Sequence, residues 1–164
     1  MGIDENKKLT FWGASPIIFI ISILYAILVF VVDHSFKPVF EIAFIPHKIL
    51  AAGAIFLLCV GIPLYLMTLK ALKTAYKKKA LITTGVFSVC RNPLFAEVVF
   101  LILPGIILFF NSWLLLTIPC FVFVMFKMFV NREELLMERE FGKKYAEYKE
   151  NTSAIFPRIW DYKK

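Results

Sequence analysis

The sequence predicts an all-α integral membrane protein with four transmembrane helices, a tight helical hairpin of the third and fourth spans, and a cytoplasmic amphipathic C-terminal helix. Three observations indicate this fold class. The 164 residues are 60% hydrophobic, and their mean hydropathy of +0.75 lies above the range of ordinary soluble domains. Four apolar stretches have about the 20 residues that a helix needs to cross a bilayer. Basic residues gather beside these stretches.

The four predicted spans are Pro16–Val32, Pro46–Leu69, Leu94–Phe110 and Ser112–Val130. We interpret the first as a retained span, because the small-residue cleavage site that would end a signal peptide does not follow it. Pro104-Gly105 predicts a kink in the third span. Only Asn111 and Ser112 separate the apolar runs of the third and fourth spans. We therefore expect these two helices to form a hairpin with almost no loop.

The distribution of positive charge predicts the topology. Lys7 and Lys8 precede the first span, and six basic residues without an acidic one lie from Lys70 to Arg91, after the second span. Only Lys37 and Lys48 lie between the first two spans. Because cytoplasmic loops carry an excess of basic residues, we expect both termini and the loop after the second span to face the cytoplasm.

Two polar segments are expected to face each other at the cytoplasmic side. In the first, Gly85 predicts a turn, and Asn92-Pro93 predicts the end of an irregular stretch and the start of the third span. In the second, after Val130, large apolar residues recur at intervals of four, four and three, which predicts one apolar helical face. These residues are Met137, Phe141, Tyr145 and Tyr148.

Glu97 lies just inside the third span. An ionisable side chain inside the membrane boundary is costly, so we expect it to face a protein cavity rather than lipid. The alternative is structural, with the carboxylate reaching the interface and pairing with Arg91 or a lysine. The sequence leaves both open.

Arg132, Glu133 and Glu134 stand at the cytoplasmic end of the fourth span. Neighbouring residues of a helix point about 100° apart, so one carboxylate can face inward while the other faces solvent. A cationic ligand or a ribose suits an inward carboxylate, whereas a solvated helix start explains the same residues without a ligand. Gly85 likewise either lets backbone approach a ligand or only makes a turn.

Several function classes are excluded by what the sequence lacks. It has no glycine-rich nucleotide loop and no Ser-His-Asp or Cys-His set on one side. No nucleic-acid recognition fold fits the short polar segments, and the three cysteines have neither disulfide nor metal spacing. His34 and His47 have no second type of metal ligand nearby, so we expect no metal. Any cofactor must be bound by the cytoplasmic ends of the spans and the two polar segments.

The order and spacing of these residues resemble those of a known family. Leu81 and Gly85, followed by Arg91-Asn92-Pro93, match its first block. Its second block is matched by Glu133-Glu134, Phe141-Gly142, Tyr145 and Tyr148, with Pro157 near a terminal proline. The blocks are similar to those of the isoprenylcysteine carboxyl methyltransferase and phospholipid methyltransferase superfamily of integral membrane enzymes. We expect one membrane domain over residues 1–164, with a two-span part at 9–80 and a methyltransferase-like part at 81–157.

The resemblance implies an S-adenosyl-L-methionine site at the cytosolic mouth of the hairpin, where the acidic pair and the Arg-Pro corner would converge around a hole sized for a nucleoside. It also implies a lipophilic acceptor that enters from the bilayer. The cofactor-binding residues that it implies are Gly85, Arg91, Asn92, Pro93, Glu133, Glu134, Tyr145 and Tyr148. Asn92 replaces a frequent histidine of the family, Phe87 and Phe95 replace tyrosines, and Val86 replaces a proline.

Methyl transfer from a sulfonium needs alignment and desolvation more than a covalent group from the protein. For a carboxylate acceptor, Arg132 or Arg91 would hold the anion through a charge-assisted hydrogen bond. For an amine acceptor, Glu97 is the candidate to accept the proton. We expect a carboxylate such as a prenylcysteine-like thioether acid. A phospholipid amine and a non-catalytic scaffold or sensor are the alternatives. The small size and lack of an organelle address favour a prokaryotic cell membrane, with the endoplasmic reticulum as the alternative.

Overall fold

The structure is a computed structural model that describes residues 15–155 of the chain. Lys7, Lys8 and Pro157, to which the sequence assigned topological or motif roles, lie outside the described residues. Within them every regular element is a helix, and the two backbone pairings are isolated bridges. The elements are α1 (Ser15–Ser35), α2 (Lys37–Phe40), α3 (His47–Lys78), α4 (Val86–Val89), α5 (Pro93–Glu97), the π-helix η1 (Val98–Ile102), α6 (Leu103–Leu108), α7 (Thr117–Phe141) and α8 (Lys143–Asn151).

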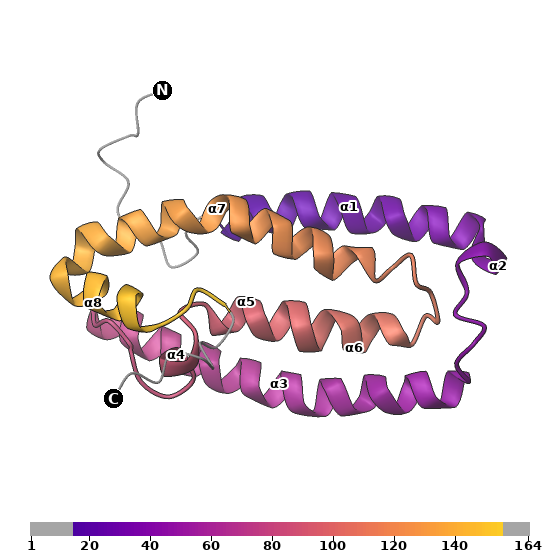
Figure 1. Cartoon of the computed structure of the whole chain (residues 1–164), viewed down its shortest axis with the longest axis horizontal. Helices are drawn as coiled ribbons and strands as arrows, with labels where there is room; N and C mark the ends of the chain where they lie inside the picture. Colours follow the sequence, from indigo (N-terminus) through magenta and orange to yellow (C-terminus); the bar gives the residue numbers. More distant parts are fainter. Residues whose placement is uncertain (1–14, 156–164) are drawn as a thin grey trace, which may run out of the picture.

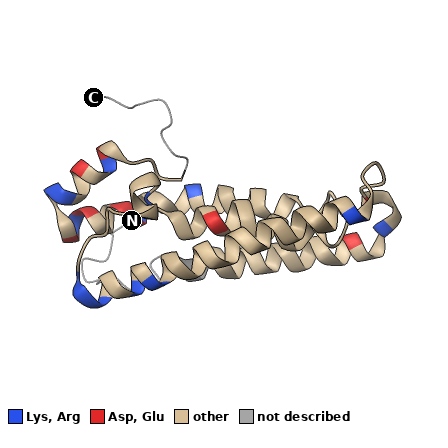
Figure 2. Cartoon of the chain, turned by 90° about the horizontal axis from the view of Figure 1, so that it is seen from below, with Lys and Arg blue, Asp and Glu red and all other residues tan. Residues whose placement is uncertain are grey.

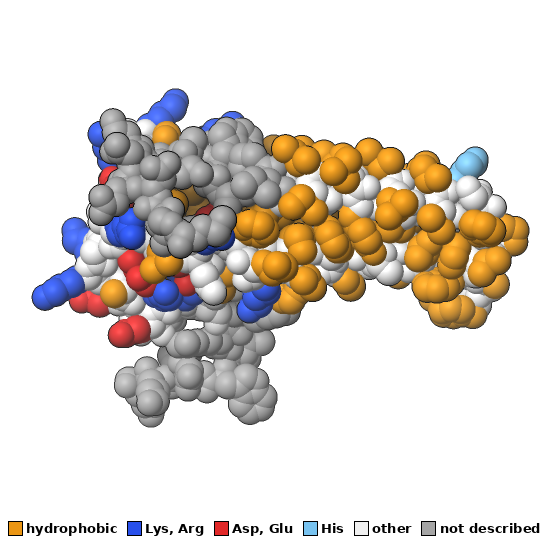
Figure 3. All heavy atoms as spheres, turned by 90° about the horizontal axis from the view of Figure 1, so that it is seen from above, with side chains coloured by type: hydrophobic (Ala, Val, Ile, Leu, Met, Phe, Trp, Pro, Cys, Tyr) orange, Lys and Arg blue, Asp and Glu red, His pale blue; other side chains and the backbone are white. Residues whose placement is uncertain are grey.

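Among the described residues, two helices are long and apolar enough to cross a membrane, Ile18–Ser35 within α1 and the whole of α3. Only 17% of the most apolar window of each helix is buried inside the molecule, whereas the core helix of a soluble protein would be mostly buried. Figure 3 shows hydrophobic side chains covering the long part of the molecule and charged side chains gathered at one end. An apolar surface of this extent is typical of a membrane-facing protein.

The long helices lie side by side along the molecule (Figure 1). α1 packs on α7, α7 packs on η1 and α6, and α3 packs on α5, η1 and α6. Glycine allows the close approach of α3: a Cβ at Gly61 would stand 2.8 Å from the Cβ of Leu101, and one at Gly105 would stand 2.9 Å from the side chain of Leu58. Close packing at small residues is the usual way in which helices associate in a membrane.

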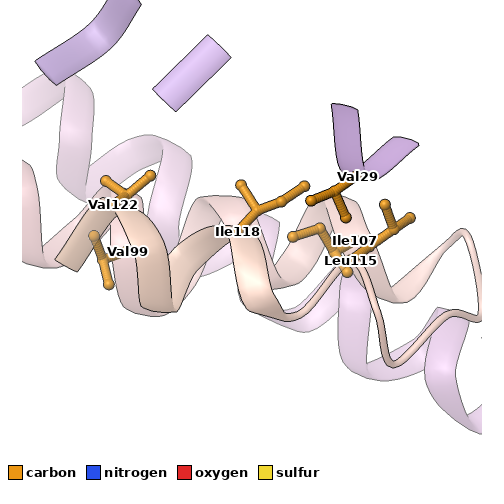
Figure 4. Packing of buried hydrophobic residues seen from close by; sticks show 6 residues of the cluster. All are labelled: Val29, Val99, Ile107, Leu115, Ile118 and Val122. Carbon is orange, nitrogen blue, oxygen red and sulfur yellow. The ribbon is translucent and has the colours of Figure 1, made fainter. Parts of the chain in front are cut away.

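Buried side chains hold the bundle together in two clusters. The larger cluster joins α1, η1, α6 and α7 (Figure 4) and consists of Val29, Val99, Ile107, Leu115, Ile118 and Val122. The smaller cluster is formed by Phe126, Val130 and Ile155, with Phe95 packed against it. It therefore ties the end of the described chain to α5 and α7, directly beside the charged end of the molecule.

The third predicted helix is assembled from α5, η1 and α6, which follow each other without a gap. It begins at Pro93, as the sequence predicts, with the proline in the first turn. The irregularity expected at Pro104-Gly105 lies one turn earlier, as the π-helix Val98–Ile102. Pro104 has no N–H to donate to the preceding turn, so the helical hydrogen bonds are rearranged just before it.

The prediction of a two-residue turn at Asn111 and Ser112 is wrong. The connection between α6 and α7 spans residues 109–116. The connection is longer than predicted because it forms hydrogen bonds with the segment after α1. Ile42 N–H donates to Asn111 O at 3.0 Å, and Trp113 N–H donates to Phe40 O at 3.1 Å. The buried Ser112 hydroxyl also donates to the Asp33 carboxylate at the end of α1. These bonds satisfy polar groups at the end of the bundle.

The expectation that Met137, Phe141, Tyr145 and Tyr148 share the face of one helix is also wrong. α7 continues from its apolar part to Phe141, where Gly142 adopts a φ of +55° and α8 begins at Lys143. A positive φ costs glycine little, so the chain can change direction there. As a result Tyr145 and Tyr148 belong to α8 and face the rest of the molecule.

Candidate functional site

The site predicted from sequence is built around the segment before α5. Arg91 N–H donates to Ser153 O at 2.8 Å and Asn92 N–H to Ala154 O at 3.1 Å. The Asn92 side-chain amide donates to the same Ala154 carbonyl at 3.2 Å. Pro93 is buried at the start of α5. The end of the described chain thus runs beside the Arg-Asn-Pro corner and fixes its backbone.

The guanidinium of Arg91 joins three parts of the chain. Its Nη1 donates to Lys149 O at 2.9 Å and to Thr152 O. Its Nη2 contacts Oε1 of Glu134 on α7. The two side chains are only 9% and 7% exposed, so this is a buried ion pair, in which removal of one partner is far more costly than at a surface. Nε of Arg91 is buried and has no hydrogen-bond partner among the described residues.

Lys149 occupies the other oxygen of Glu134. Its Nζ lies 3.1 Å from Glu134 Oε2 and 2.7 Å from Glu138 Oε1. The hydrogen bonds to Glu138 and then to Glu134 raise the pKa of Lys149 above its usual range. Two cations and two anions therefore balance in this cluster, which we call the charged cluster: Arg91, Lys149, Glu134 and Glu138. It lies at the charged end of the bundle (Figure 2).

Two buried tyrosines complete the same region. The rings of Tyr145 and Tyr148 meet edge to face, with centroids 6.1 Å apart, and the Tyr148 hydroxyl donates to Phe87 O at 2.6 Å. Burial, followed by the nearby Glu134 carboxylate, raises the pKa of Tyr145 to about 12. Burial also raises the pKa of Tyr148. Both phenols are therefore uncharged at neutral pH.

Glu97 faces a different helix. Its Oε1 accepts a 2.7 Å hydrogen bond from the hydroxyl of Thr68 on α3, and Thr68 is completely buried. Oε2 of Glu97 is buried without a hydrogen-bond partner in residues 15–155. Burial raises the pKa of the Cys90 thiol; a hydrogen bond from the Asn92 backbone opposes this rise, and the nearby Glu97 carboxylate adds to it. The Glu97 carboxylate therefore acts electrostatically on the residue next to Arg91, although it does not pair with Arg91.

The remaining predicted residues lie at the edge of the site. Gly85 is exposed at the start of α4 with a φ of +67° and open space around it. Glu133 is half-buried, one residue before Glu134. Arg132 is exposed, with its guanidinium carbon 5.8 Å from the centre of the Phe129 ring. Neither Gly85 nor Arg132 contacts the charged cluster through a described hydrogen bond or ion pair.

The acidic pair and the Arg-Pro corner do converge, through Glu134, but the expected gap between them is wrong. Arg91 and Glu134 touch, because opposite charges with little access to water attract strongly. Two grooves are hollowed elsewhere: one of about 380 Å³ along α3, and an apolar one of about 370 Å³ between α1, α6 and the start of α7. Within residues 15–155 no group of three or more His, Cys, Asp or Glu side chains is arranged to hold a metal.

Sequence reasoning missed Lys149 and Thr68. Lys149 follows Tyr145 by one helical turn, but the sequence does not show that α8 folds back onto α7. A periodic pattern could have identified Thr68. Four small residues recur at intervals of seven along α3 and are buried: Ala54, Gly61, Thr68 and Ala75. This spacing marks the face of α3 that packs on α5, η1 and α6. On this face the Thr68 hydroxyl donates a hydrogen bond to Glu97.

The family model described as phospholipid methyltransferase (PEMT) matches residues 49–144. The match begins in α3, which carries none of the motifs discussed above, and it includes Arg91, Glu97 and Glu134. It ends one residue before Tyr145. Neither a search of curated proteins nor a search of solved structures finds a match.

Proposed function

The chain belongs to the phospholipid methyltransferase family, and from this premise we propose that it transfers a methyl group from S-adenosyl-L-methionine to an acceptor embedded in the membrane. Family membership and the two long apolar helices support a membrane methyltransferase. We further propose that it crosses the membrane four times, with both termini in the cytoplasm and the charged cluster at the cytoplasmic face. The observation that carries the proposal is the buried contact between Arg91 and Glu134.

The residues at this contact suit the cofactor. Its amino-acid part bears a carboxylate, for which Nε of Arg91 is a buried donor without a described partner. Glu134 offers a buried carboxylate for a cationic or hydroxyl group, in place of Lys149. Tyr145 and Tyr148 stay neutral and supply aromatic surface. When bound, the cofactor supplies a methyl group on a sulfonium. We propose that Gly85, Arg91, Asn92, Pro93, Glu133, Glu134, Tyr145 and Tyr148 hold it.

For the acceptor we favour the amine of a phospholipid headgroup. A protonated amine must lose a proton before its nitrogen can form a bond to the methyl carbon, and Oε2 of Glu97 is a buried oxygen free to take that proton. Thr68 holds the other oxygen and so fixes the orientation of the carboxylate. The negative charge of Glu97 also attracts an ammonium headgroup.

A carboxylate acceptor, such as a prenylcysteine-like thioether acid, is the second candidate. Nη1 and Nη2 of Arg91 are engaged with Glu134 and two carbonyls, and its remaining donor, Nε, is the one proposed to bind the carboxylate of the cofactor. Arg91 therefore has no donor left for a carboxylate acceptor. Arg132 is exposed at the same end of α7 and remains the residue that would bind a carboxylate. No proton acceptor is then required, and Glu97 would be dispensable.

Calorimetry with S-adenosylhomocysteine in detergent tests the cofactor site. We expect the wild type to bind it and Glu134→Gln to bind at least tenfold more weakly, a loss of about 1.4 kcal/mol. Glu138→Gln is the matched control, because Glu138 contacts Lys149 but not Arg91, and its affinity should stay within about twofold of the wild type. Absence of binding by a folded wild-type protein would support a non-catalytic scaffold or sensor instead.

Labelled cofactor incubated with membrane lipid distinguishes the acceptors. A labelled phospholipid whose methyl label is not released by base, lost in Glu97→Gln and retained in Arg132→Gln, supports the amine. A base-labile labelled product with the opposite dependence on the two variants supports the carboxylate.

A further inference from the structure

The last turns of α3 carry a basic groove that the proposed methyl transfer does not use. Three lysines line it at intervals of three and four residues, and two leucines line the end nearer the middle of α3. The lining residues are Leu66, Leu69, Lys70, Lys73, Thr74 and Lys77. Its volume is about 380 Å³, and Figure 2 shows basic residues along this end of the molecule.

The groove faces away from the rest of the bundle. Thr68 and Ala75 are the buried residues of this part of α3. At about 100° per residue, Lys70 and Lys73 lie well over 90° around the helix from Ala75. The groove is therefore on the outer surface of α3, on a different side of this helix from the contact between Thr68 and Glu97.

The lysines of the groove lack acidic partners. In the described part of the chain the salt bridges of basic residues with acids involve Arg91 and Lys149, and none involves Lys70, Lys73 or Lys77. All three are exposed. Three uncompensated ammonium groups within two turns of helix repel each other, and an anion placed among them would be attracted by all three.

The position of the groove along α3 indicates the kind of anion. A helix of 32 residues is about 48 Å long, whereas the hydrocarbon core of a bilayer is about 30 Å thick. If α3 enters the bilayer at its first residue, about 20 residues bring it to Leu66, and Lys70 and Lys73 follow about 6 and 10 Å later. Leu66 is 58% exposed. Apolar side chains thus lie at the depth of the acyl chains and ammonium groups at the depth of the phosphates.

We propose that this groove binds an anionic phospholipid of the cytoplasmic leaflet, with its phosphate among Lys70, Lys73 and Lys77 and the start of an acyl chain against Leu66 and Leu69. The occupant is a lipid rather than a free phosphate, because the groove combines the lysines with an apolar wall. Binding here anchors the cytoplasmic end of α3 and does not depend on methyl transfer.

Native mass spectrometry of the full-length protein with dioleoylphosphatidylglycerol tests the proposal. We expect this lipid to bind at least tenfold more tightly than dioleoylphosphatidylcholine. The variant K70Q/K73Q/K77Q should lose this preference, and K70R/K73R/K77R should keep it. The matched control is K78Q/K143Q/K144Q, which removes three exposed lysines at the same end of the molecule that do not line the groove. It should retain most of the preference.

Three results would overturn the proposal. One is equal binding of the two lipids by the wild type, which needs no variant. Another is an equal loss of preference in the groove variant and its control, which would show that total charge rather than the groove attracts the lipid. The third is competition by inorganic phosphate as strong as that by the lipid, which would assign the site to a free anion. Helical circular dichroism of each variant confirms that it is folded.

Discussion

Arg91 determines more of the local structure than any other single residue of the site. Its side chain reaches Glu134, Lys149 and Thr152, while its backbone pairs with Ser153. A lysine could not replace it, because one ammonium cannot reproduce a planar fork of donors. The sequence identified Arg91 and Glu134 each as candidate cofactor-binding residues. It could not show that they touch, since 43 residues separate them.

At the residue scale, the buried tyrosines make the stability of the folded chain depend on pH. Because the pKa of Tyr145 in the folded chain is about 12, above the unfolded value near 10, the stabilisation that its burial provides is complete below pH 10. It is lost as the pH rises from about 10 through 12. We expect the tyrosinate absorbance at 295 nm of the folded wild type to keep rising above pH 11.

The variant Tyr145→Phe/Tyr148→Phe should lose this late component of the titration. Protein unfolded in denaturant serves as the reference, in which all six tyrosines titrate near pH 10. If the absorbance lost in the folded variant is instead a component that titrates near pH 10, neither phenol is shielded from water.

Thr68 gives a second prediction at this scale. Thr68→Val keeps the side-chain volume but removes the 2.7 Å hydrogen bond to Glu97, so both carboxylate oxygens lose their orientation. We expect methyl transfer to fall about tenfold or more while the affinity for S-adenosylhomocysteine is unchanged. Thr68→Ser, which keeps the hydroxyl, should restore most of the activity. A loss of cofactor affinity in Thr68→Val would instead assign Thr68 a purely structural role.

Among the elements, α3 is the one that sequence patterns predict best. Its apolar run and the start of α5 at Pro93 follow from local chemistry, although α3 continues beyond the predicted end of the span at Leu69 to Lys78. The connection at residues 109–116 and the break at Gly142 do not, because both depend on contacts with distant segments. A hydropathy pattern predicts which segments are buried in lipid or protein. It does not predict which polar groups of a loop form hydrogen bonds with distant segments.

Glycines of α3 test the packing of the elements. Gly61→Ala would place a Cβ 2.8 Å from Leu101, whereas Gly53→Ala would make an ordinary contact at 3.8 Å with Leu108. We expect Gly61→Ala to lower the midpoint of thermal unfolding in detergent, since α3 and η1, which carries Leu101, must move apart. Gly53→Ala should leave it unchanged or raise it slightly, because alanine favours the helix by roughly 1 kcal/mol. Equal effects would contradict the close approach at Gly61.

At the scale of the whole molecule, the candidate site lies at one end of the bundle, and the buried hydrogen bond between Ser112 and Asp33 lies at the other. Arg91, Glu134, Lys149 and the two tyrosines occupy one end of the bundle, while Asp33 and Ser112 join the loops at the opposite end. The sequence predicted the clustering of the two polar segments from topology alone. It did not predict the pairing of residues 90–92 with 153–154, because extended backbone pairing leaves no periodic signal in so short a segment.

The most direct test of the central claim is transfer of a labelled methyl group by the purified protein reconstituted in phospholipid vesicles. We expect S-adenosyl-L-methionine labelled in its methyl group to yield labelled lipid with the wild type. Glu138→Gln should behave similarly, and Glu134→Gln, shown to be folded by circular dichroism, should transfer at least tenfold less. Unlabelled lipid in every sample, or equal labelling by Glu134→Gln and the wild type, would contradict a methyltransferase site at the Arg91–Glu134 contact.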